Sequence, residues 1–329
     1  MIPLYPEIEP YATHSIEMEP LSNGIHHQVY VEECGNPEGI PIVFLHGGPG
    51  SGCRPQHRCY FAPDLYRIIL FDQRGCGRSQ PHGELENNTT SYLIADMETI
   101  RQQLNVDNWI IFGGSWGATL GLCYAQQHPE KVLAMILRGV FLGRQQDIDW
   151  VYAEGGASRL FPDAWHNLVK HLPLAEQKQP LKAYYQQLTH TDEVHQMAAA
   201  KTLQVWESTI VTLRDSEYQH DHTKEPGPLA HSRIQLHFAL NQCFISDAAI
   251  LDNLDSIKDI PTIIIHGRYD IVCPIQQSWE LHQAWPETKF TIVPMAGHAA
   301  GEPALIDALI EATRNIGKQI QPHLNNPSA

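Results

Sequence analysis

The stretch Trp109-Ile-Ile-Phe-Gly-Gly-Ser-Trp-Gly117 decides the fold of this chain. Its apolar start, Trp109 to Phe112, predicts a short buried strand, and Trp116 to Gln127 has the pattern of a helix. Between them, Gly113-Gly-Ser-Trp-Gly117 fits G-x-S-x-G, the nucleophile elbow, in the strand–turn–helix context that this motif requires. A serine in this turn projects from the sheet edge, and the helix N-terminus behind it favours negative charge. The sequence therefore predicts Ser115 as a nucleophile.

Apolar runs and helical stretches alternate along much of the chain, from about residue 40 to 140 and again from about 260 onward. Tyr92 to Leu104, for example, shows the apolar spacing of a helix. Short apolar strands separated by helices are typical of a mostly parallel sheet covered on both faces, so we predict an α/β fold. The further predicted strands are Ile42 to Leu45, Arg67 to Phe71, Val132 to Leu137, Thr262 to Ile265 and Phe290 to Val293.

Residues 143–248 differ in composition, because they are rich in Gln, His, Trp and Tyr and lack strand-like runs. Leu181 to Leu188 and Met197 to Leu213 have a helical pattern, and the Pro- and Gly-rich segment Glu225 to Pro228 indicates a loop. We predict that 143–248 form a helical cap, inserted between the two parts of a core at 1–142 and 249–329.

A serine hydroxyl is a poor nucleophile without a general base. In chains with this elbow the order is serine, then Asp or Glu, then His. Asp270 follows the predicted strand Thr262 to Ile265, and His298 follows Phe290 to Val293. Both lie on loops at the carboxyl ends of strands, where the sites of open α/β sheets occur. The sequence predicts a triad of Ser115, His298 as base and Asp270 as the residue that orients the base.

An oxyanion hole needs two hydrogen-bond donors. One is expected from the backbone N–H of Trp116, directly after the nucleophile, and the second from the loop after an early strand. Here that loop is His46-Gly-Gly-Pro-Gly50, and we expect Gly48 to be the donor. The loop lacks the Lys-Ser/Thr of a P-loop and the third glycine of G-x-G-x-x-G, which argues against nucleotide binding.

Net charge and composition limit the classes of partner and the cellular compartment that fit this chain. With 22 basic and 37 acidic residues, the chain has a formal charge of −15, which argues against nucleic acid or an anionic membrane as a partner. The first residues have no basic start or apolar core of a signal peptide, and no apolar run approaches the ~18 residues of a membrane span. Seven cysteines without regular spacing indicate free thiols in a reducing compartment, so we expect a cytoplasmic protein.

Several cysteines lie close to histidines or to the predicted triad in the sequence. Cys53, His57 and Cys59 match no standard zinc spacing, and we expect neither a metal nor a cofactor. Cys273, three residues after Asp270, is expected near the site, either as a packing residue or as a thiol that makes the protein sensitive to thiol reagents.

Beyond these patterns, the chain resembles the proline iminopeptidases, also called prolyl aminopeptidases. The similarity extends over nearly the whole chain, and its motifs occur in order, which makes it highly specific. The motifs are His46-Gly-Gly-Pro-Gly50, Asp72-Gln-Arg-Gly-Cys-Gly-Arg-Ser79, Gly113-Gly-Ser-Trp-Gly117, Leu137-Arg-Gly-Val-Phe-Leu142, Glu154-Gly-Gly-Ala-Ser-Arg-Leu-Phe-Pro-Asp163, Trp206-Glu207 and Gly267-Arg-Tyr-Asp-Ile-Val-Cys-Pro274.

The resemblance implies an α/β-hydrolase core with a helical cap, free of cofactors, that releases N-terminal proline from peptides. The family's triad falls on the three residues already reached, and its cap carboxylate falls on Glu207. A carboxylate suits this task because it can hold a charged substrate amine by charge-assisted hydrogen bonds. Phe141, Trp150 and Tyr152 are candidate apolar walls for a proline ring.

One position departs from the family pattern. The family usually carries a second cap glutamate in an Arg-Ile-Glu sequence, whereas this chain has Arg233-Ile-Gln235. Gln235 can accept a hydrogen bond through its carbonyl but brings no charge. The loss of one charge-assisted contact costs on the order of 1–3 kcal/mol in binding.

The sequence thus predicts a serine aminopeptidase acting on short peptides with N-terminal proline, through an acyl-enzyme. Two alternatives stay open because a fold does not fix a function. One is a hydrolase of esters or amides without a free amine, which Gln235 favours. The other is a non-catalytic ligand-binding protein, which an intact triad and oxyanion loop argue against.

Overall fold

The structure is a computed structural model that describes residues 2–211, 213 and 228–325. Its centre is an eight-stranded sheet with the order β1-β2-β4-β3-β5-β6-β7-β8, in which β2 runs antiparallel to both of its neighbours and the pairs from β4 to β8 are parallel. The strands are β1 (Ala12–Pro20), β2 (His26–Gly35), β3 (Ile40–Leu45), β4 (Tyr66–Phe71), β5 (Trp109–Gly114), β6 (Val132–Arg138), β7 (Thr262–Gly267) and β8 (Lys289–Val293).

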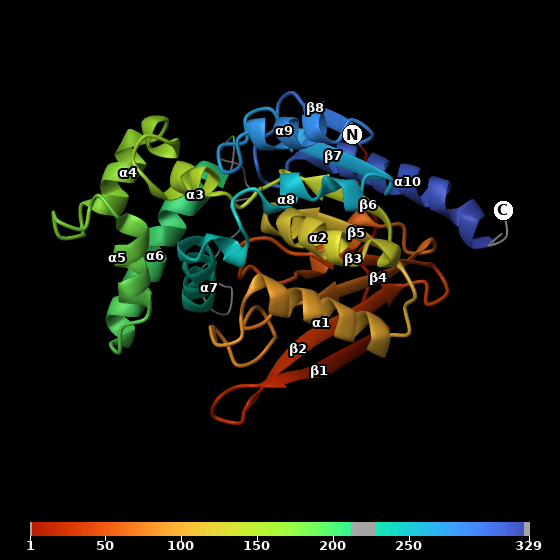
Figure 1. Cartoon of the computed structure of the whole chain (residues 1–329), viewed down its shortest axis with the longest axis horizontal. Helices are drawn as coiled ribbons and strands as arrows, with labels where there is room; N and C mark the ends of the chain where they lie inside the picture. Colours follow the sequence, from red (N-terminus) through yellow and green to blue (C-terminus); the bar gives the residue numbers. More distant parts are fainter. Residues whose placement is uncertain (1, 212, 214–227, 326–329) are drawn as a thin grey trace.

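Helices cover both faces of this sheet (Figure 1). Because successive side chains of a strand point to opposite faces, the continuous apolar strands supply two cores. One core packs against α1 (Thr90–Gln103), α2 (Trp116–Gln127), α8 (Ala249–Asp252) and α9 (Gln276–Ala284), and the other packs mainly against α10 (Pro303–Asn325). The predicted α/β class, with a mostly parallel sheet covered on both faces, is confirmed.

The described part of 143–248 is helical and contains no strand. Figure 1 shows these helices gathered beside the sheet, on the left of the view, where their buried side chains form a third cluster. The predicted loop at Glu225 to Pro228 lies outside the described residues except for Pro228, which begins α7. The longer helices are α3 (Gln145–Tyr152), α4 (Pro162–Val169), α5 (Pro180–Leu188), α6 (Glu193–Val211) and α7 (Pro228–Leu240).

The carboxyl ends of β3, β5, β6, β7 and β8 meet at one edge, because these five strands are parallel neighbours. The loops that follow them carry Gly48, Ser115, Phe141, Asp270 and His298, respectively. Residues far apart in the sequence are therefore brought to one edge of the sheet by strand order alone.

Candidate active site

Ser115 lies on a strained turn between β5 and α2, with φ 57° and ψ −126°. A non-glycine residue with positive φ is held there only when its surroundings over-determine it. The flanking glycines do so by allowing close packing: a Cβ on Gly117 would collide with the Leu45 carbonyl at the end of β3, and one on Gly113 would collide with the Gly117 carbonyl. The first turn of α2 thus packs directly on the neighbouring strand and fixes the position of Ser115.

Asp270 and His298 form a buried pair, in which His298 Nδ1 lies 2.7 Å from Asp270 Oδ2. The other carboxylate oxygen accepts a hydrogen bond from the Cys273 N–H at 2.8 Å, and His266 Nε2 lies 3.4 Å from Oδ2. Burial alone would raise the pKa of Asp270, but attraction to His298 and the hydrogen bonds from His298 and Cys273 outweigh it and lower that pKa. Asp270 is therefore ionised at neutral pH and can hold the proton of His298 on Nδ1.

The second ring nitrogen of His298 faces an arginine. Its Nε2 lies 3.4 Å from Nη1 of Arg138, and Arg138 Nη1 also donates to the His298 carbonyl at 2.8 Å. Within residues 2–211, 213 and 228–325, no hydrogen bond joins Ser115 Oγ to Nε2. Catalytic hydrogen bonds are often long before substrate binds, so this geometry is compatible with a nucleophile–base pair.

The loop with Gly48 lies across the elbow. A Cβ on Gly47 would lie 3.5 Å from the Ser115 Cβ, and Gly48 has a φ of +110°, a conformation that favours glycine. Among the described residues, the N–H groups of Gly48 and Trp116 donate to no other group. Both donors can therefore be directed at a substrate oxygen.

Gln73 joins the two halves of this predicted oxyanion site. Its N–H donates to His46 Nε2 at 3.0 Å, and its amide donates to the His46 carbonyl at 2.9 Å. Its amide oxygen accepts a hydrogen bond from the Trp116 indole at 2.9 Å. The sequence reasoning assigned Gln73 no role, although the residue lies in a motif shared with the family.

The buried His46 predicts a measurable pH dependence of stability. Burial lowers the pKa of His46, so the folded state binds fewer protons than the unfolded state as the pH falls below about 6.5. The unfolding free energy should therefore decrease on acidification. In His46→Gln, we expect the decrease between pH 7 and 5.5, measured by urea unfolding, to be smaller by about 1 kcal/mol. The exposed His171 gives the control: His171→Gln should keep the wild-type slope, and an unchanged slope in His46→Gln would contradict the prediction.

Glu207 lies on α6, half-buried, and accepts a hydrogen bond from the Tyr152 hydroxyl at 3.1 Å. Burial, with the charge and hydrogen bond of Glu207, raises the pKa of Tyr152 well above its usual value, so the hydroxyl stays protonated and donates. One turn after Glu207, the Val211 carbonyl accepts a hydrogen bond from the His298 N–H at 3.3 Å. The helix that carries Glu207 thus ends against the loop that carries His298.

Gln235 lies on the face of α7 that is turned toward the elbow. Residues 231, 235 and 238 share one helix face. A Cβ on Gly50 would lie 2.9 Å from the His231 carbonyl, and Phe238 packs edge-to-face on Trp116 with ring centroids 4.9 Å apart. Gln235 lies between these two contacts, and its buried Oε1 accepts no hydrogen bond from the described residues.

The remaining predicted contacts lie between the sheet and the helices of residues 143–248. Phe141 is partly buried and packs against both the first core and the third cluster, and its carbonyl accepts a hydrogen bond from Thr119 at 2.6 Å. The Trp150 indole donates to the Ile271 carbonyl at 2.6 Å, which ties α3 to the loop of Asp270. Tyr152, expected as an apolar wall, directs its hydroxyl at Glu207 instead of presenting only its ring.

Cys273 is fully buried next to the predicted triad, as expected from its position in the sequence. Burial raises the pKa of its thiol well above the usual value, and a hydrogen bond with Ser115 opposes that rise. The thiol is therefore protonated at neutral pH and is a weak nucleophile.

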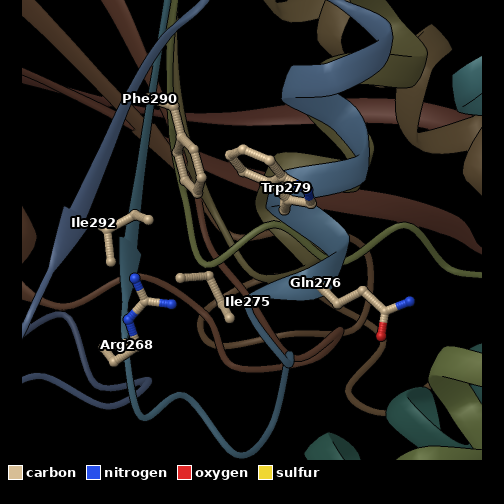
Figure 2. A pocket seen from close by; sticks show the side chains of 6 residues that line it. All are labelled: Arg268, Ile275, Gln276, Trp279, Phe290 and Ile292. Atoms are coloured by element: carbon tan, nitrogen blue, oxygen red, sulfur yellow. The ribbon is translucent and has the colours of Figure 1, made fainter.

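A surface pocket of about 200 Å³ lies apart from these residues (Figure 2). It is formed between α9 and β8, and Trp279 and Phe290 provide aromatic surfaces in it. Its lining has no nucleophile or general base and includes none of the predicted site residues. The lining consists of Arg268, Ile275, Gln276, Trp279, Phe290 and Ile292.

Two further searches cover only the part of the chain that the structure describes. No cluster of three or more His, Cys, Asp or Glu side chains there could hold a metal ion. No helix in the same residues has the length and apolar content to cross a membrane.

Comparison with known proteins identifies the class first. Residues 40–304 match the family model described as the alpha/beta hydrolase fold. Solved structures agree at the level of the fold: an esterase from Thermogutta terrifontis has a TM-score of 0.58 at 15% identity, covering 95% of this chain and 98% of its own. An esterase from Exiguobacterium antarcticum has a TM-score of 0.55 at 21% identity, covering 89% and 96%. The fold and the elbow are those of an α/β-hydrolase.

Relatives at higher sequence identity show which family of α/β-hydrolases the chain belongs to. A proline iminopeptidase from Xylella fastidiosa is 46% identical over 312 residues, which is 94% of this chain and 98% of the relative. One from Arabidopsis thaliana is 44% identical over 316 residues, which is 95% of this chain and 82% of the relative. The chain belongs to the proline iminopeptidase family.

Proposed function

We propose that this protein is a serine aminopeptidase that releases N-terminal proline from short peptides. The observation that carries the proposal is the buried Asp270–His298 hydrogen bond beside the strained elbow of Ser115. In this mechanism Ser115 Oγ attacks the carbonyl carbon of the N-terminal residue, and its proton passes to His298 Nε2. Asp270 holds the other ring nitrogen and stabilises the imidazolium that forms.

The later steps use the loops around the elbow. The N–H groups of Gly48 and Trp116 stabilise the oxyanion of the tetrahedral intermediate. This role is supported by the fact that neither N–H group donates to another acceptor among the described residues. His298 then protonates the leaving amine, and a water molecule hydrolyses the acyl-enzyme with His298 again acting as base. None of these steps needs a cofactor.

The substrate amine is held by the cap in this proposal. Glu207 binds the charged nitrogen of the N-terminal proline, and Tyr152 fixes the carboxylate by its hydrogen bond. The buried, unpaired Oε1 of Gln235 accepts a second hydrogen bond from the same nitrogen. Residues 143–248 form the cap over a core built from 1–142 and 249–329, and the cap restricts entry to the ends of peptide chains, with Phe141 beside the proline ring.

The expected location is the cytoplasm. All seven cysteines are free thiols in the structure, and most of them are buried. Free thiols are the usual state of cysteines in a reducing compartment.

The decisive experiment compares proline-β-naphthylamide with its N-acetylated form. Cleavage of the free-amine substrate alone is expected, because acetylation removes the charge that Glu207 binds. Ser115→Ala should abolish this cleavage, and activity retained in that variant would contradict the serine mechanism.

A second candidate is an esterase or amidase that does not need a free amine. The uncharged Gln235 favours it, because one of the two expected carboxylates is missing. Equal cleavage of the free and acetylated substrates, or faster cleavage of a small ester such as p-nitrophenyl acetate, would select this candidate over an aminopeptidase.

A further inference from the structure

Arg138, the last residue of β6, lies between the nucleophile and the base. It pairs in register with Gly114, and its guanidinium lies over that residue, where a Cβ would collide with it. The side chain is half-buried and is directed to the same side of the sheet as Ile136 and α10. Arg138 belongs to the Leu137-to-Leu142 motif, to which the proposed reaction assigns only Phe141.

The predicted nucleophile and the predicted base both bond to Arg138. Its backbone carbonyl accepts a hydrogen bond from the Ser115 N–H at 2.9 Å. Its Nη1 donates to the His298 carbonyl at 2.8 Å and faces Nε2 of the same residue at 3.4 Å. One residue therefore sets the position of the elbow and of the base relative to each other.

No ion pair with a described residue accounts for the partial burial of the Arg138 guanidinium. Among the residues that the structure describes, Arg138 pairs with no carboxylate. Other buried arginines are paired in the usual way, Arg58 with Glu32 at 2.8 Å and Arg74 with Asp96 at 2.6 Å. A half-buried charge without a carboxylate is costly, so its contacts with His298 require an explanation.

The two side-chain contacts of the His298 ring favour the same tautomer, with the proton on Nδ1. An arginine N–H can donate to Nε2 only while that nitrogen carries a lone pair. Asp270, on the other side, accepts the proton on Nδ1. Among the described residues, Arg138 and Asp270 are the two whose side chains bond to this ring, and both stabilise the tautomer that can take a proton from Ser115.

We propose that Arg138 is a positioning residue of the active site, which holds His298 through its carbonyl and selects the Nδ1–H tautomer of its ring. This role rests on the proposed serine mechanism. Nε2 has a single lone pair, so the Nη1 contact must be released before the Ser115 hydroxyl can donate to that nitrogen and transfer its proton, while the bond to the His298 carbonyl stays. When Nε2–H passes its proton to the leaving amine, the contact forms again and favours the neutral base.

The backbone of the same loop is held by other groups. The His298 N–H donates to the Val211 carbonyl, and the Gly297 N–H donates to Glu302 Oε2 at 2.9 Å. These contacts keep the loop in place when Arg138 is removed, so the variant should fold while the ring loses its orientation. The expected defect is therefore in rate and not in substrate binding.

Arg138→Ala should lower kcat for proline-β-naphthylamide about 100-fold, because a misplaced base loses most of its contribution, and should leave KM within about threefold. Guanidinium chloride at low concentration should restore part of kcat in this variant, whereas sodium chloride at equal ionic strength should not. Arg138→Lys keeps a donor for the carbonyl and should recover about tenfold of the loss. Arg101→Ala removes an arginine that pairs with Glu98 far from the site, and it should keep the wild-type kcat.

A second readout separates this proposal from the proposed function. The rate at which a fluorophosphonate labels Ser115 reports on the nucleophile and base without any peptide substrate, and it should fall in Arg138→Ala by about the same factor as kcat. Unchanged labelling, or a defect confined to KM, would overturn the positioning role. An equal loss of kcat in Arg101→Ala would also overturn it, by showing general destabilisation. If wild type is labelled but does not cleave the proline substrate, the proposed specificity fails while the role of Arg138 is still tested.

Discussion

Asp270→Asn is expected to lower kcat for proline-β-naphthylamide about 10⁴-fold while KM stays within about threefold. Asp270 accepts the Nδ1 proton of His298 at 2.7 Å, whereas an asparagine can offer that nitrogen an N–H donor. The ring would then carry its proton on Nε2, where it cannot accept the proton of Ser115. Steady-state kinetics with the purified variant measure both constants.

The size of this loss in kcat shows whether Asp270 orients the His298 ring or only stabilises the fold. Ser115→Ala sets the floor, with an expected loss of about 10⁶-fold. Asp255→Asn, in an exposed carboxylate, should have no effect on kcat. If Asp270→Asn kept more than about a tenth of the activity, another group would have to orient His298, and His266, 3.4 Å from the same carboxylate oxygen, is the first residue to test.

The strands of the sheet centre could be predicted because each is a continuous apolar run buried on two faces. β5 and β7 were predicted within two residues of their observed bounds. The antiparallel β1 and β2 were missed, since polar and apolar residues mix in both strands and neither is a continuous apolar run; β1 is the exposed edge strand and β2 lies between β1 and β4. The helical stretches expected from about residue 260 onward include α10, in which Leu305, Leu309 and Ile316 repeat at helical spacing and face the sheet, although the bounds of this helix were not predicted.

The candidate site was only partly predictable. Ser115, Asp270 and His298 could be singled out because strand order and motif order constrain them together. Gln73 and Arg138 could not, because each acts through a contact with a residue distant in the sequence. Gln73, for example, bonds to both His46 and Trp116, and neither contact leaves a periodic pattern. Such supporting residues become visible only when the loops at the sheet edge are placed side by side.

Glu207→Gln is expected to raise KM for proline-β-naphthylamide about 10- to 100-fold, because a charged hydrogen bond contributes about 1.5–3 kcal/mol and each 1.4 kcal/mol is tenfold in affinity. The glutamine keeps the size of the side chain and can still accept the Tyr152 hydroxyl, so the cap should stay folded. Initial rates over a range of substrate concentrations give KM, and a melting curve checks the fold.

The same helix provides the matched control, since Glu193 is an exposed acid in its first turn. Glu193→Gln removes an equal charge from the far end of α6 and should leave KM unchanged. Gln235→Glu tests the opposite change: a second carboxylate should lower KM about tenfold in wild type and recover part of the loss in Glu207→Gln. If Glu207→Gln bound the free amine as well as wild type does, the amine would have to be held elsewhere, and a KM unaffected by Gln235→Glu would place α7 outside the amine site.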